Sequence, residues 1–253
     1  MSARLSPPLP EQPGAGRPRR LSQPLRHRWR LTPKEAARLQ EKLRSQLVVR
    51  GGPRRVRLVA GADAAYLTEP ARCLAVAVVL RLPQLELIEE VVVERPVSFP
   101  YVPGLLSFRE GPAVLAAVRR LHNVPELIIF DGHGLAHPRR FGLASHLGLL
   151  LGIPAVGCAK SLLVGEHEAV GRQAGSWSWL VHQGRRLGMA VRTQTGVRPV
   201  YVSPGHLVGF RAALRLVLQT VGRYRLAEPT RLADILVARA KAARSATRSK
   251  ASG

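Results

Sequence analysis

Hydrophobic and polar residues follow two patterns along this chain, helical spacing in some stretches and short apolar runs in others. Thr32, Pro33 and Glu35 form a capping box with proline in the first turn, which predicts that a helix begins there. Helical spacing predicts helices over residues 33–48, 107–121, 141–151, 206–221 and 230–240. Apolar runs between turn residues predict strands over residues 56–67, 73–82, 85–97, 126–131, 155–159, 187–193 and 199–203.

The order of these elements predicts a single domain of the α/β class over residues 34–240. The first three strands are close together and joined by short turns, so we expect them to form an antiparallel meander. Strands and helices alternate after residue 100, which adds parallel strands to the same sheet. We therefore expect a mixed sheet, three antiparallel strands followed by parallel strands in the order 3-2-1-4-5, flanked by helices.

Both ends of the chain have the composition of solvated basic segments. Residues 1–33 contain seven prolines and seven arginines with a single acid, Glu11, and we expect a disordered arm. Residues 241–253 hold no acid and are expected to be a second disordered tail. The arm has no apolar segment of a secretory signal, and no apolar run is long enough to span a membrane. These features predict a cytoplasmic protein without a membrane partner.

The net charge is the strongest feature of the composition. The chain has 39 Lys and Arg residues against 16 Asp and Glu residues, a formal charge of +23. Such a charge favours a polyanionic partner, of which nucleic acid is the usual one, although a general bias of the composition toward arginine would also produce it. The two cysteines, Cys73 and Cys158, lie in apolar runs, which excludes a disulfide scaffold and indicates a reducing compartment.

The few carboxylates of the body fall at informative places. Asp63 lies inside an apolar strand, and Asp131 ends another, directly before Gly132, His133 and Gly134. A carboxylate on a buried strand costs several kcal/mol unless it is paired or binds a cation. If the first and fourth strands are neighbours, Asp63 and Asp131 face each other near the strand ends.

Glu110 has two interpretations. With Ser107 it fits a capping box at the start of a helix. Alternatively, it is the third oxygen ligand of a site for Mg²⁺ or Mn²⁺, which prefer carboxylates. Such an ion beside a polyanion points to hydrolysis of phosphodiester bonds.

The loop after Asp131 gathers histidines, arginines and glycines. Glycines allow a ligand to approach the backbone, and Arg and His supply contacts to phosphates. A zinc site made by His133, His137 and His146 is the weaker alternative, because the loop contains Gly and Pro. Lys160 ends a strand at the same sheet edge and is either an ordinary surface lysine or a phosphate contact. Tyr101 lies in a stiff, proline-flanked loop and is either a buried aromatic or an exposed wedge between bases.

Together these segments resemble endonuclease V, the family of inosine-directed repair nucleases. The resemblance is carried by residues 60–63, 100–110, 131–139, 157–160, 203–206 and 228–234. It implies an RNase H-like fold and hydrolysis that depends on a divalent metal. Asp63, Glu110 and Asp131 match the residues around the metal, and Asp234 matches a supporting carboxylate.

The resemblance also implies roles for residues around the lesion. Tyr101 matches the wedge that fills the gap left by an extruded base. His137 and Lys160 match residues near the scissile phosphate, and His206 lies in a matching segment without an assigned role. The positions that match the lining of the base pocket are Gly104, Leu106, Gly132, Leu143 and Gly157.

Three positions depart from the family's pattern or vary within it. Glu126 stands where an aspartate is expected, and Cys158 replaces an aliphatic residue, a tolerable change in a core. His133 is commonly asparagine in animal relatives, which favours the bacterial type and DNA as the substrate.

The resulting hypothesis is a monomeric, Mg²⁺-dependent DNA repair endonuclease, with Mn²⁺ able to substitute. It recognises deaminated bases, chiefly deoxyinosine, in double- or single-stranded DNA. The family cuts the second phosphodiester bond 3′ to the lesion, which leaves a 3′-hydroxyl and a 5′-phosphate. Two alternatives remain: an inosine-specific ribonuclease on the same fold, and a nucleic-acid-binding protein without catalysis.

Overall fold

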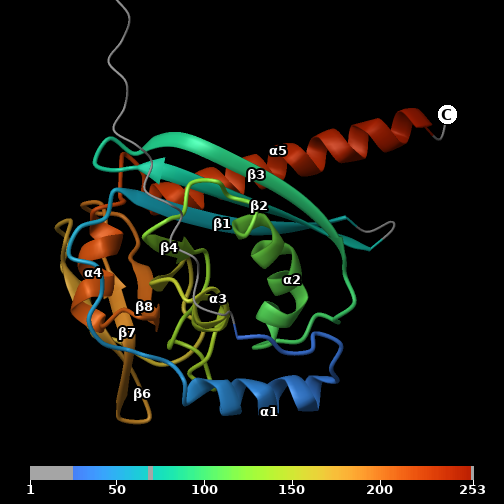
Figure 1. The fold of residues 1–253 in the computed structure, drawn as a ribbon. Helices are drawn as coiled ribbons and strands as arrows, with labels where there is room; N and C mark the ends of the chain where they lie inside the picture. The colour runs from blue at the N-terminus through green and yellow to red at the C-terminus, as the bar shows by residue number, and fades with distance from the viewer. Residues whose placement is uncertain (1–24, 68–70, 252–253) are drawn as a thin grey trace, which may run out of the picture.

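The computed structural model describes residues 25–67 and 71–251, and within them eight strands form one sheet (Figure 1). The strands are β1 (Leu58–Leu67), β2 (Arg72–Arg81), β3 (Glu86–Pro96), β4 (Leu127–Phe130), β5 (Ala155–Ala159), β6 (Trp177–His182), β7 (Arg185–Val191) and β8 (Val200–His206). The helices are α1 (Pro33–Arg44), α2 (Leu106–Val118), α3 (Leu143–Leu151), α4 (Phe210–Leu218) and α5 (Glu228–Ala251).

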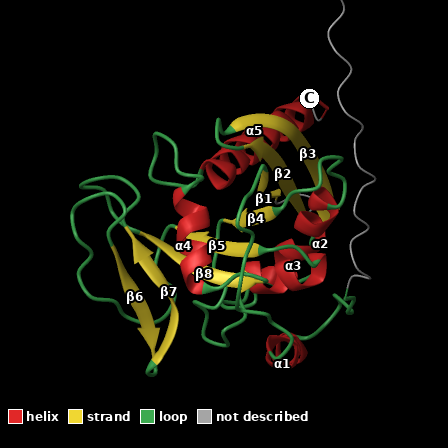
Figure 2. Cartoon of the chain, turned by 60° about the vertical axis from the view of Figure 1, so that its left-hand side comes forward, coloured by secondary structure: helices red, strands yellow, loops and turns green. Residues whose placement is uncertain are grey.

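The sheet has the order β3-β2-β1-β4-β5-β8-β7-β6, which confirms the predicted 3-2-1-4-5 arrangement and extends it. β1, β2 and β3 form the expected antiparallel meander, and β4 and β5 add in parallel. β8 pairs antiparallel with β5, and β7 and β6 continue as an antiparallel hairpin at one end of the sheet (Figure 2). The sequence does not predict β6, because this edge strand is mostly half-exposed and carries no continuous apolar run.

Side chains of the central strands alternate between two cores. On β4, Leu127 and Ile129 pack in the cluster formed with α4 and α5, whereas Ile128 and Phe130 pack in the cluster formed with α2 and α3. Helices on both faces therefore bury the sheet, as the apolar strand β4 requires. None of the helices in the described ranges is long and apolar enough to cross a membrane.

α1 lies outside these two layers. Its Ala36 packs with Phe99, Leu105 and Phe108 in a separate small cluster, which fixes the helix against the segment that precedes α2. Thr32 caps α1, and both hydrogen bonds of the predicted capping box to Glu35 are present. This arrangement places one face of α1 beside the carboxyl ends of β4 and β5.

Several helix boundaries differ from the sequence prediction. The capping box predicted at Ser107 is wrong, because α2 starts at Leu106 and the Ser107 hydroxyl pairs with Nδ1 of His146 at 2.8 Å. α4 starts at Phe210 rather than at residue 206, because His206 completes β8 opposite Ala155. α1 ends at Arg44 rather than at residue 48.

The two terminal segments are more ordered than predicted where the structure describes them. Residues 1–24 of the predicted arm lie outside the described residues, but His27 and Trp29 pack on His146 and Phe108. The tail prediction is wrong for residues 241–251, which continue α5. Alanine, arginine and lysine are strong helix formers, and Arg244 pairs with Glu94 of β3 at 3.6 Å.

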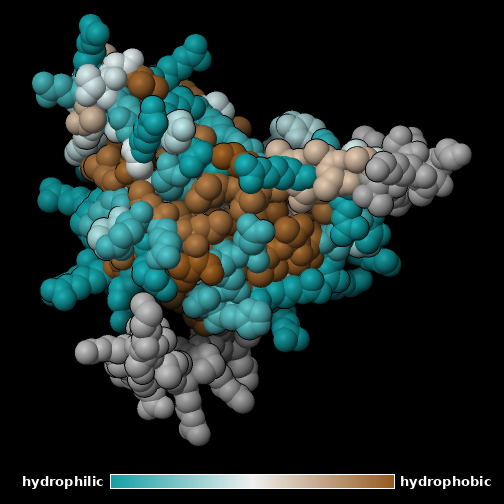
Figure 3. Space-filling model, turned by 90° about the horizontal axis from the view of Figure 1, so that it is seen from above, coloured by the Kyte–Doolittle hydropathy of each residue, from teal (hydrophilic) through white to brown (hydrophobic). Residues whose placement is uncertain are grey.

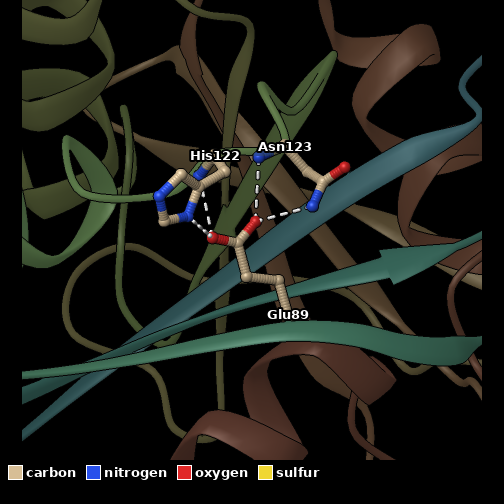
Figure 4. Close-up of polar contacts among 3 residues, drawn as sticks. All are labelled: Glu89, His122 and Asn123. Atoms are coloured by element: carbon tan, nitrogen blue, oxygen red, sulfur yellow. Dashed lines mark hydrogen bonds and ion pairs between the residues drawn. The ribbon is translucent and has the colours of Figure 1, made fainter.

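A carboxylate of β3 organises the turn after α2. Glu89 accepts hydrogen bonds from the backbone N–H groups of His122 and Asn123, each at 2.8 Å, and from both side chains (Figure 4). Burial raises the pKa of Glu89, but these hydrogen bonds outweigh burial and hold the pKa below its ordinary value. Glu89 thus serves the fold, at a distance from the strand ends that carry Asp63 and Asp131.

β3 is an exposed edge of the sheet. Seen from above, apolar side chains gather on the middle of the face, surrounded by hydrophilic ones (Figure 3). Leu87 and Val92 of β3 are exposed, and the same strand carries four glutamates. Charged residues on an edge strand oppose its pairing with another sheet.

Candidate active site

A cavity of about 430 Å³ opens where the middle of β1 lies beside the carboxyl ends of β4 and β5, next to α1 and the start of α2. Ten of the predicted site residues line it: Asp63, Tyr101, Gly104, Leu106, Glu110, Asp131, Gly132, His137, Leu143 and Lys160. These residues come from four separate stretches of the sequence: β1, residues 101–110, residues 131–143 and the residue after β5. The fold therefore assembles most of the site that the sequence predicts.

The pairing of β1 with β4 brings two aspartates together. Ala62 pairs with Phe130 in parallel register; Asp63 follows Ala62 within β1, and Asp131 directly follows the end of β4. Neighbouring strands lie about 4.8 Å apart, so the two residues are direct neighbours at the cavity floor. The expectation that Asp63 and Asp131 share one sheet edge is confirmed.

Burial and mutual repulsion perturb the carboxylates of this floor. Burial, together with the charges of Asp131 and Asp234, raises the pKa of Asp63 to about 6. Burial and the same kind of repulsion, from Asp63 and Asp131, raise the pKa of Glu110 to about 7. Both carboxyl groups are therefore buried and close to other carboxylates, and each of these effects disfavours the charged form.

Glu110 binds a tyrosine hydroxyl and forms no ion pair with a basic side chain among the described residues. The Tyr66 hydroxyl donates to Glu110 Oε1 at 3.0 Å, and burial raises the pKa of Tyr66, so that this proton stays in place. Arg109 lies over the Tyr66 ring, 4.5 Å from its centroid. The sequence does not point to Tyr66, which lies three residues after Asp63 on β1.

Lys160 connects two of the carboxylates. Its Nζ lies 2.7 Å from Asp131 Oδ2 and 3.2 Å from Asp234 Oδ2, which joins the end of β5 to α5. Burial lowers the pKa of Lys160, but the two carboxylates outweigh burial and raise it, so the ammonium group stays charged. Lys160 is thus part of the site, and Asp234 reaches the site through Lys160 without lining the cavity.

His137 is fixed by the backbone. Burial lowers its pKa to about 4, so the ring is neutral at pH 7. Its Nε2–H donates to the carbonyl of Gly104 at 2.9 Å, and its Nδ1 accepts from the N–H of Arg139 at 3.2 Å. Both ring nitrogens are occupied, and in this arrangement His137 positions the Gly104 loop.

Gln40 lines the cavity beside Gly104 and His137, and the sequence does not point to it. Its amide donates to the carbonyls of Gly104 and Phe141, each at 3.1 Å, and its oxygen accepts from Arg139 Nε at 2.6 Å. A signal is present in hindsight, since Gln40 stands between Ala36 and Leu43 on the apolar stripe of α1 and is only 1% exposed. A polar residue on such a stripe needs hydrogen-bond partners in the interior.

The rim of the cavity is apolar and exposed. Tyr101 is 71% exposed, which rejects the buried-aromatic interpretation, and it lies in the Pro100–Pro103 loop. Leu162 and Leu163, which the sequence does not single out, also line the cavity and are exposed. An exposed tyrosine at a cavity mouth can contact a ligand without any change of the fold.

Other predicted residues lie elsewhere. Gly157 is beneath the floor, where a Cβ atom would lie 2.5 Å from the Gly132 carbonyl oxygen. His206 accepts from the N–H of Val48 at 3.3 Å and does not line the cavity. The zinc alternative fails, because Ser107 and His27 occupy both ring nitrogens of His146.

The carboxylates fit a hard divalent cation by their chemistry. No three His, Cys, Asp or Glu side chains of the described residues are grouped as a metal site. Lys160 Nζ holds Asp131 instead. However, no ion pair joins Asp63 or Glu110 to a basic side chain within the described ranges, and burial, followed by repulsion from neighbouring carboxylates, raises the pKa of both. Carboxylate oxygens without a basic partner are the kind of ligand that Mg²⁺ or Mn²⁺ prefers.

The sequence profile of the endonuclease V family matches residues 41–235, which include every carboxylate of this floor. The chain belongs to the endonuclease V family. Endonuclease V of Roseiflexus sp. strain RS-1 is 50% identical over 208 residues, 82% of this chain and 93% of the relative. Endonuclease V of Myxococcus xanthus is 49% identical over 216 residues, 85% of this chain and 92% of the relative.

Solved structures of endonuclease V agree with the fold. The Streptomyces avermitilis enzyme is 43% identical with a TM-score of 0.82, over 86% of this chain and 96% of that one. Ciona intestinalis endonuclease V, crystallised with DNA containing an inosine followed by a ribo-adenosine, is 25% identical with a TM-score of 0.73. That match covers 83% of this chain and 98% of the Ciona chain. The predicted family, mixed-sheet fold and deoxyribonuclease class are confirmed.

Two departures from the family's pattern have structural explanations. Glu126 accepts hydrogen bonds from the backbone N–H groups of Arg57 and Leu58, at the opposite end of β4 from Asp131. It fixes the start of β1 and takes no part in the cavity. Cys158 is buried on β5 in the core formed with α4 and α5, where a small apolar side chain suffices.

Proposed function

We propose that this endonuclease V recognises deoxyinosine and other deaminated bases in DNA and hydrolyses the second phosphodiester bond 3′ to the lesion. The products carry a 3′-hydroxyl and a 5′-phosphate. One observation carries the proposal: crowded, buried carboxylates form the floor of a base-sized cavity with an exposed tyrosine at its rim. Cavities of a few hundred Å³ are typical of small-molecule sites.

The floor of the cavity is the hydrolytic centre. Asp63, Asp131 and Glu110 would hold Mg²⁺, or Mn²⁺ in its place, and the cation would activate water and stabilise the leaving oxygen. Tyr66 keeps Glu110 in position through its hydroxyl. Lys160 keeps Asp131 and Asp234 in position and adds a fixed positive charge at the place where a phosphate has to approach.

The walls of the cavity suit an extruded base. Flipping a base out of the duplex costs a few kcal/mol, and less where an inosine weakens the base pair. Tyr101 would fill the gap that the flipped base leaves. Gly104 and Gly132 leave room, and Leu143 offers an apolar surface. His133 also lines the cavity, and its buried Nδ1 has no hydrogen-bond partner among the described residues, so a base could use it.

One assay tests this proposal directly. Matched duplexes with and without a single inosine are incubated with Mg²⁺ or with a chelator, and nicks are mapped on both strands. We expect nicking only with inosine and Mg²⁺, at the second bond 3′ to the lesion. Asp131→Asn is expected to abolish nicking and to keep lesion binding, so normal nicking by this variant would refute the proposed floor.

RNA is the second candidate substrate. The DNA bound by the Ciona relative carries a ribo-adenosine after the inosine, which supports a test with RNA. Inosine oligonucleotides of one sequence are prepared as DNA, as RNA and as DNA with a single ribonucleotide at the cleavage position. We expect the all-DNA substrate to be cut at least as fast as the others, whereas cutting only next to a 2′-hydroxyl would make the chain a ribonuclease.

We also propose that the enzyme works as a cytoplasmic monomer on double- or single-stranded DNA. Charged residues on the edge strand β3 oppose its pairing with the sheet of a second copy, which supports a monomer. Light scattering of the free protein and of its complex with an inosine duplex tests the oligomeric state.

A further inference from the structure

Three arginines from separate elements are near enough for their charges to act on one another, since those of Arg44 and Arg185 both act on Arg140. Arg44 ends α1, Arg140 belongs to the loop between β4 and α3, and Arg185 begins β7. We call these three residues the guanidinium patch. They are about 40 to 140 positions apart in the sequence, so only the fold brings their charges together.

Two of the three arginines continue the wall of the cavity. Gln40, which lines the cavity, lies four residues before Arg44, so both are on one face of α1. Arg140 directly follows Arg139, whose guanidinium binds the carbonyl of Gly104 at 2.8 Å and the side chain of Gln40. The patch therefore adjoins the wall formed by Gln40 and Gly104.

The β6–β7 hairpin supplies the third arginine. Leu187 of β7 is buried with Ala136 of the loop after Asp131 in a small cluster that also includes Leu180 of β6. This cluster fixes the hairpin to the same loop that carries Arg140. Arg185 lies two residues before Leu187, directly after the tight turn at Gln183 and Gly184, both of which have positive φ.

The charges of the patch repel one another and have no acidic partner. No ion pair connects Arg44, Arg140 or Arg185 to a carboxylate in the parts of the chain that the structure describes. Burial and the charges of Arg44 and Arg185 lower the pKa of Arg140. Arg140 also has a φ of 52°, an unfavourable backbone conformation for a residue other than glycine. An anion bound between these guanidinium groups would offset their mutual repulsion.

We propose that the guanidinium patch binds phosphates of the DNA backbone outside the base pocket. Arginine pairs with phosphate through two parallel hydrogen bonds, and such contacts fix the register of a nucleic acid without reading its sequence. The patch would hold the strand on the Gln40 side of the cavity while the carboxylate floor works on the other side. The proposal rests on DNA being the substrate, as proposed above, and adds a second anchoring point.

Salt dependence of binding tests the patch separately from catalysis. Affinity for a labelled duplex without inosine is measured by fluorescence anisotropy at several salt concentrations, in the presence of a chelator. The triple variant Arg44→Gln, Arg140→Gln, Arg185→Gln is compared with the wild type. Each lost phosphate contact is expected to reduce the slope of log K against log salt by about 0.9, so the triple variant loses up to about 2.7.

A matched control separates contacts from overall charge. Arg120, Arg211 and Arg223 are exposed and come from separate places, so their triple change to glutamine removes the same charge. The control is expected to change the slope by less than about 0.5. Equal slopes in both triple variants would overturn the proposal. A patch variant with lysine in all three positions should restore most of the slope.

Two further measurements make the result unambiguous. If the triple variant melts well below the wild type, the single variants Arg44→Gln and Arg185→Gln replace it, each with an expected slope change of about 0.9. An unchanged slope in both single variants also overturns the proposal. Inosine-dependent nicking by the wild type is scored in a separate assay, so a failure of the proposed function leaves the slopes interpretable.

Discussion

Substituting alanine at Gly132 or at Gly157 tests the base pocket separately from the packing beneath it. Gly132 lines the cavity, and a Cβ atom there would meet only the Leu143 side chain, at 3.3 Å from Cδ2 and 3.6 Å from Cβ. At Gly157 a Cβ atom would lie 2.5 Å from the Gly132 carbonyl oxygen and 2.6 Å from the Gly134 nitrogen. One substitution thus presses on a flexible side chain, and the other presses on backbone.

The expected magnitudes follow from these neighbours. For Gly132→Ala, the tight contact with Leu143 is offset by the lower entropy of the unfolded chain, which stabilises by about 0.4–1 kcal/mol, so stability should change by less than about 1 kcal/mol. The methyl group narrows the pocket, and a change of that size in a pocket alters affinity by about 10–200-fold. Gly157→Ala forces the loop after Asp131 to move, and overpacking of this kind costs about 1–3 kcal/mol or more.

Two readouts on each variant check the prediction. Thermal melting measures stability, and the ratio of affinities for inosine-containing and unmodified duplexes measures the pocket. Gly132→Ala should keep its melting temperature and lose most of the ratio, whereas Gly157→Ala should lose both. An unchanged ratio in Gly132→Ala would mean that the base does not bind in this cavity. Wild-type melting of Gly157→Ala would contradict the packing of the loop on β5.

Three further outcomes are expected. Tyr101→Ala should melt like the wild type, because Tyr101 is 71% exposed. It should bind inosine duplexes about 10-fold more weakly in anisotropy titrations, since stacking contributes about 1–3 kcal/mol per base. Equal affinity would reject the role of Tyr101 as a wedge. Mg²⁺ should raise the melting temperature of the wild type but not of Asp131→Asn, with a gain of about 2.7 kcal/mol at 100 times its Kd, and equal shifts would reject the carboxylate floor. Because the pKa of Glu89 is held below its ordinary value of 4.5, the stability it adds is present above that pH and is lost as the pH falls through the lowered pKa. Denaturant unfolding of Glu89→Gln and wild type should therefore differ most near neutral pH and converge in acid, and a constant difference would reject the role of this ionisation.

The sequence predicted the parts of the site that depend on strands and their ends. Asp63 and Asp131 were located because an acid within or after an apolar strand is unusual, and the parallel register of β1 and β4 then makes them neighbours. The order of the first five strands followed from short turns and from the alternation of strands with helices. These features are local, or follow from rules of chain connection.

The sequence failed where a contact between distant segments decides the outcome. Ser107 and Glu110 fit a capping box locally, yet the Ser107 hydroxyl pairs with His146, and Glu110 pairs with Tyr66. Trp29 lies in a segment with the composition of a disordered arm, yet its ring fills the space above Gly111, where a Cβ atom would lie 2.8 Å from the ring. Complementary shapes of this kind leave no periodic signal in either segment.

The distribution of charge explains why the centre of the site needs a cation. A chain of charge +23 attracts a polyanion, but the floor of the cavity gathers Asp63, Glu110 and Asp131, and Asp234 is close by. Negative groups that face a phosphate oppose the binding that the rest of the surface favours. Lys160 compensates Asp131 and Asp234 at 2.7 and 3.2 Å, but Asp63 and Glu110 keep raised pKa values. A divalent ion held by Asp63, Glu110 and Asp131 would offset this negative charge and let a phosphate approach, so the charges that would weaken a simple binding protein suit a phosphodiester hydrolase.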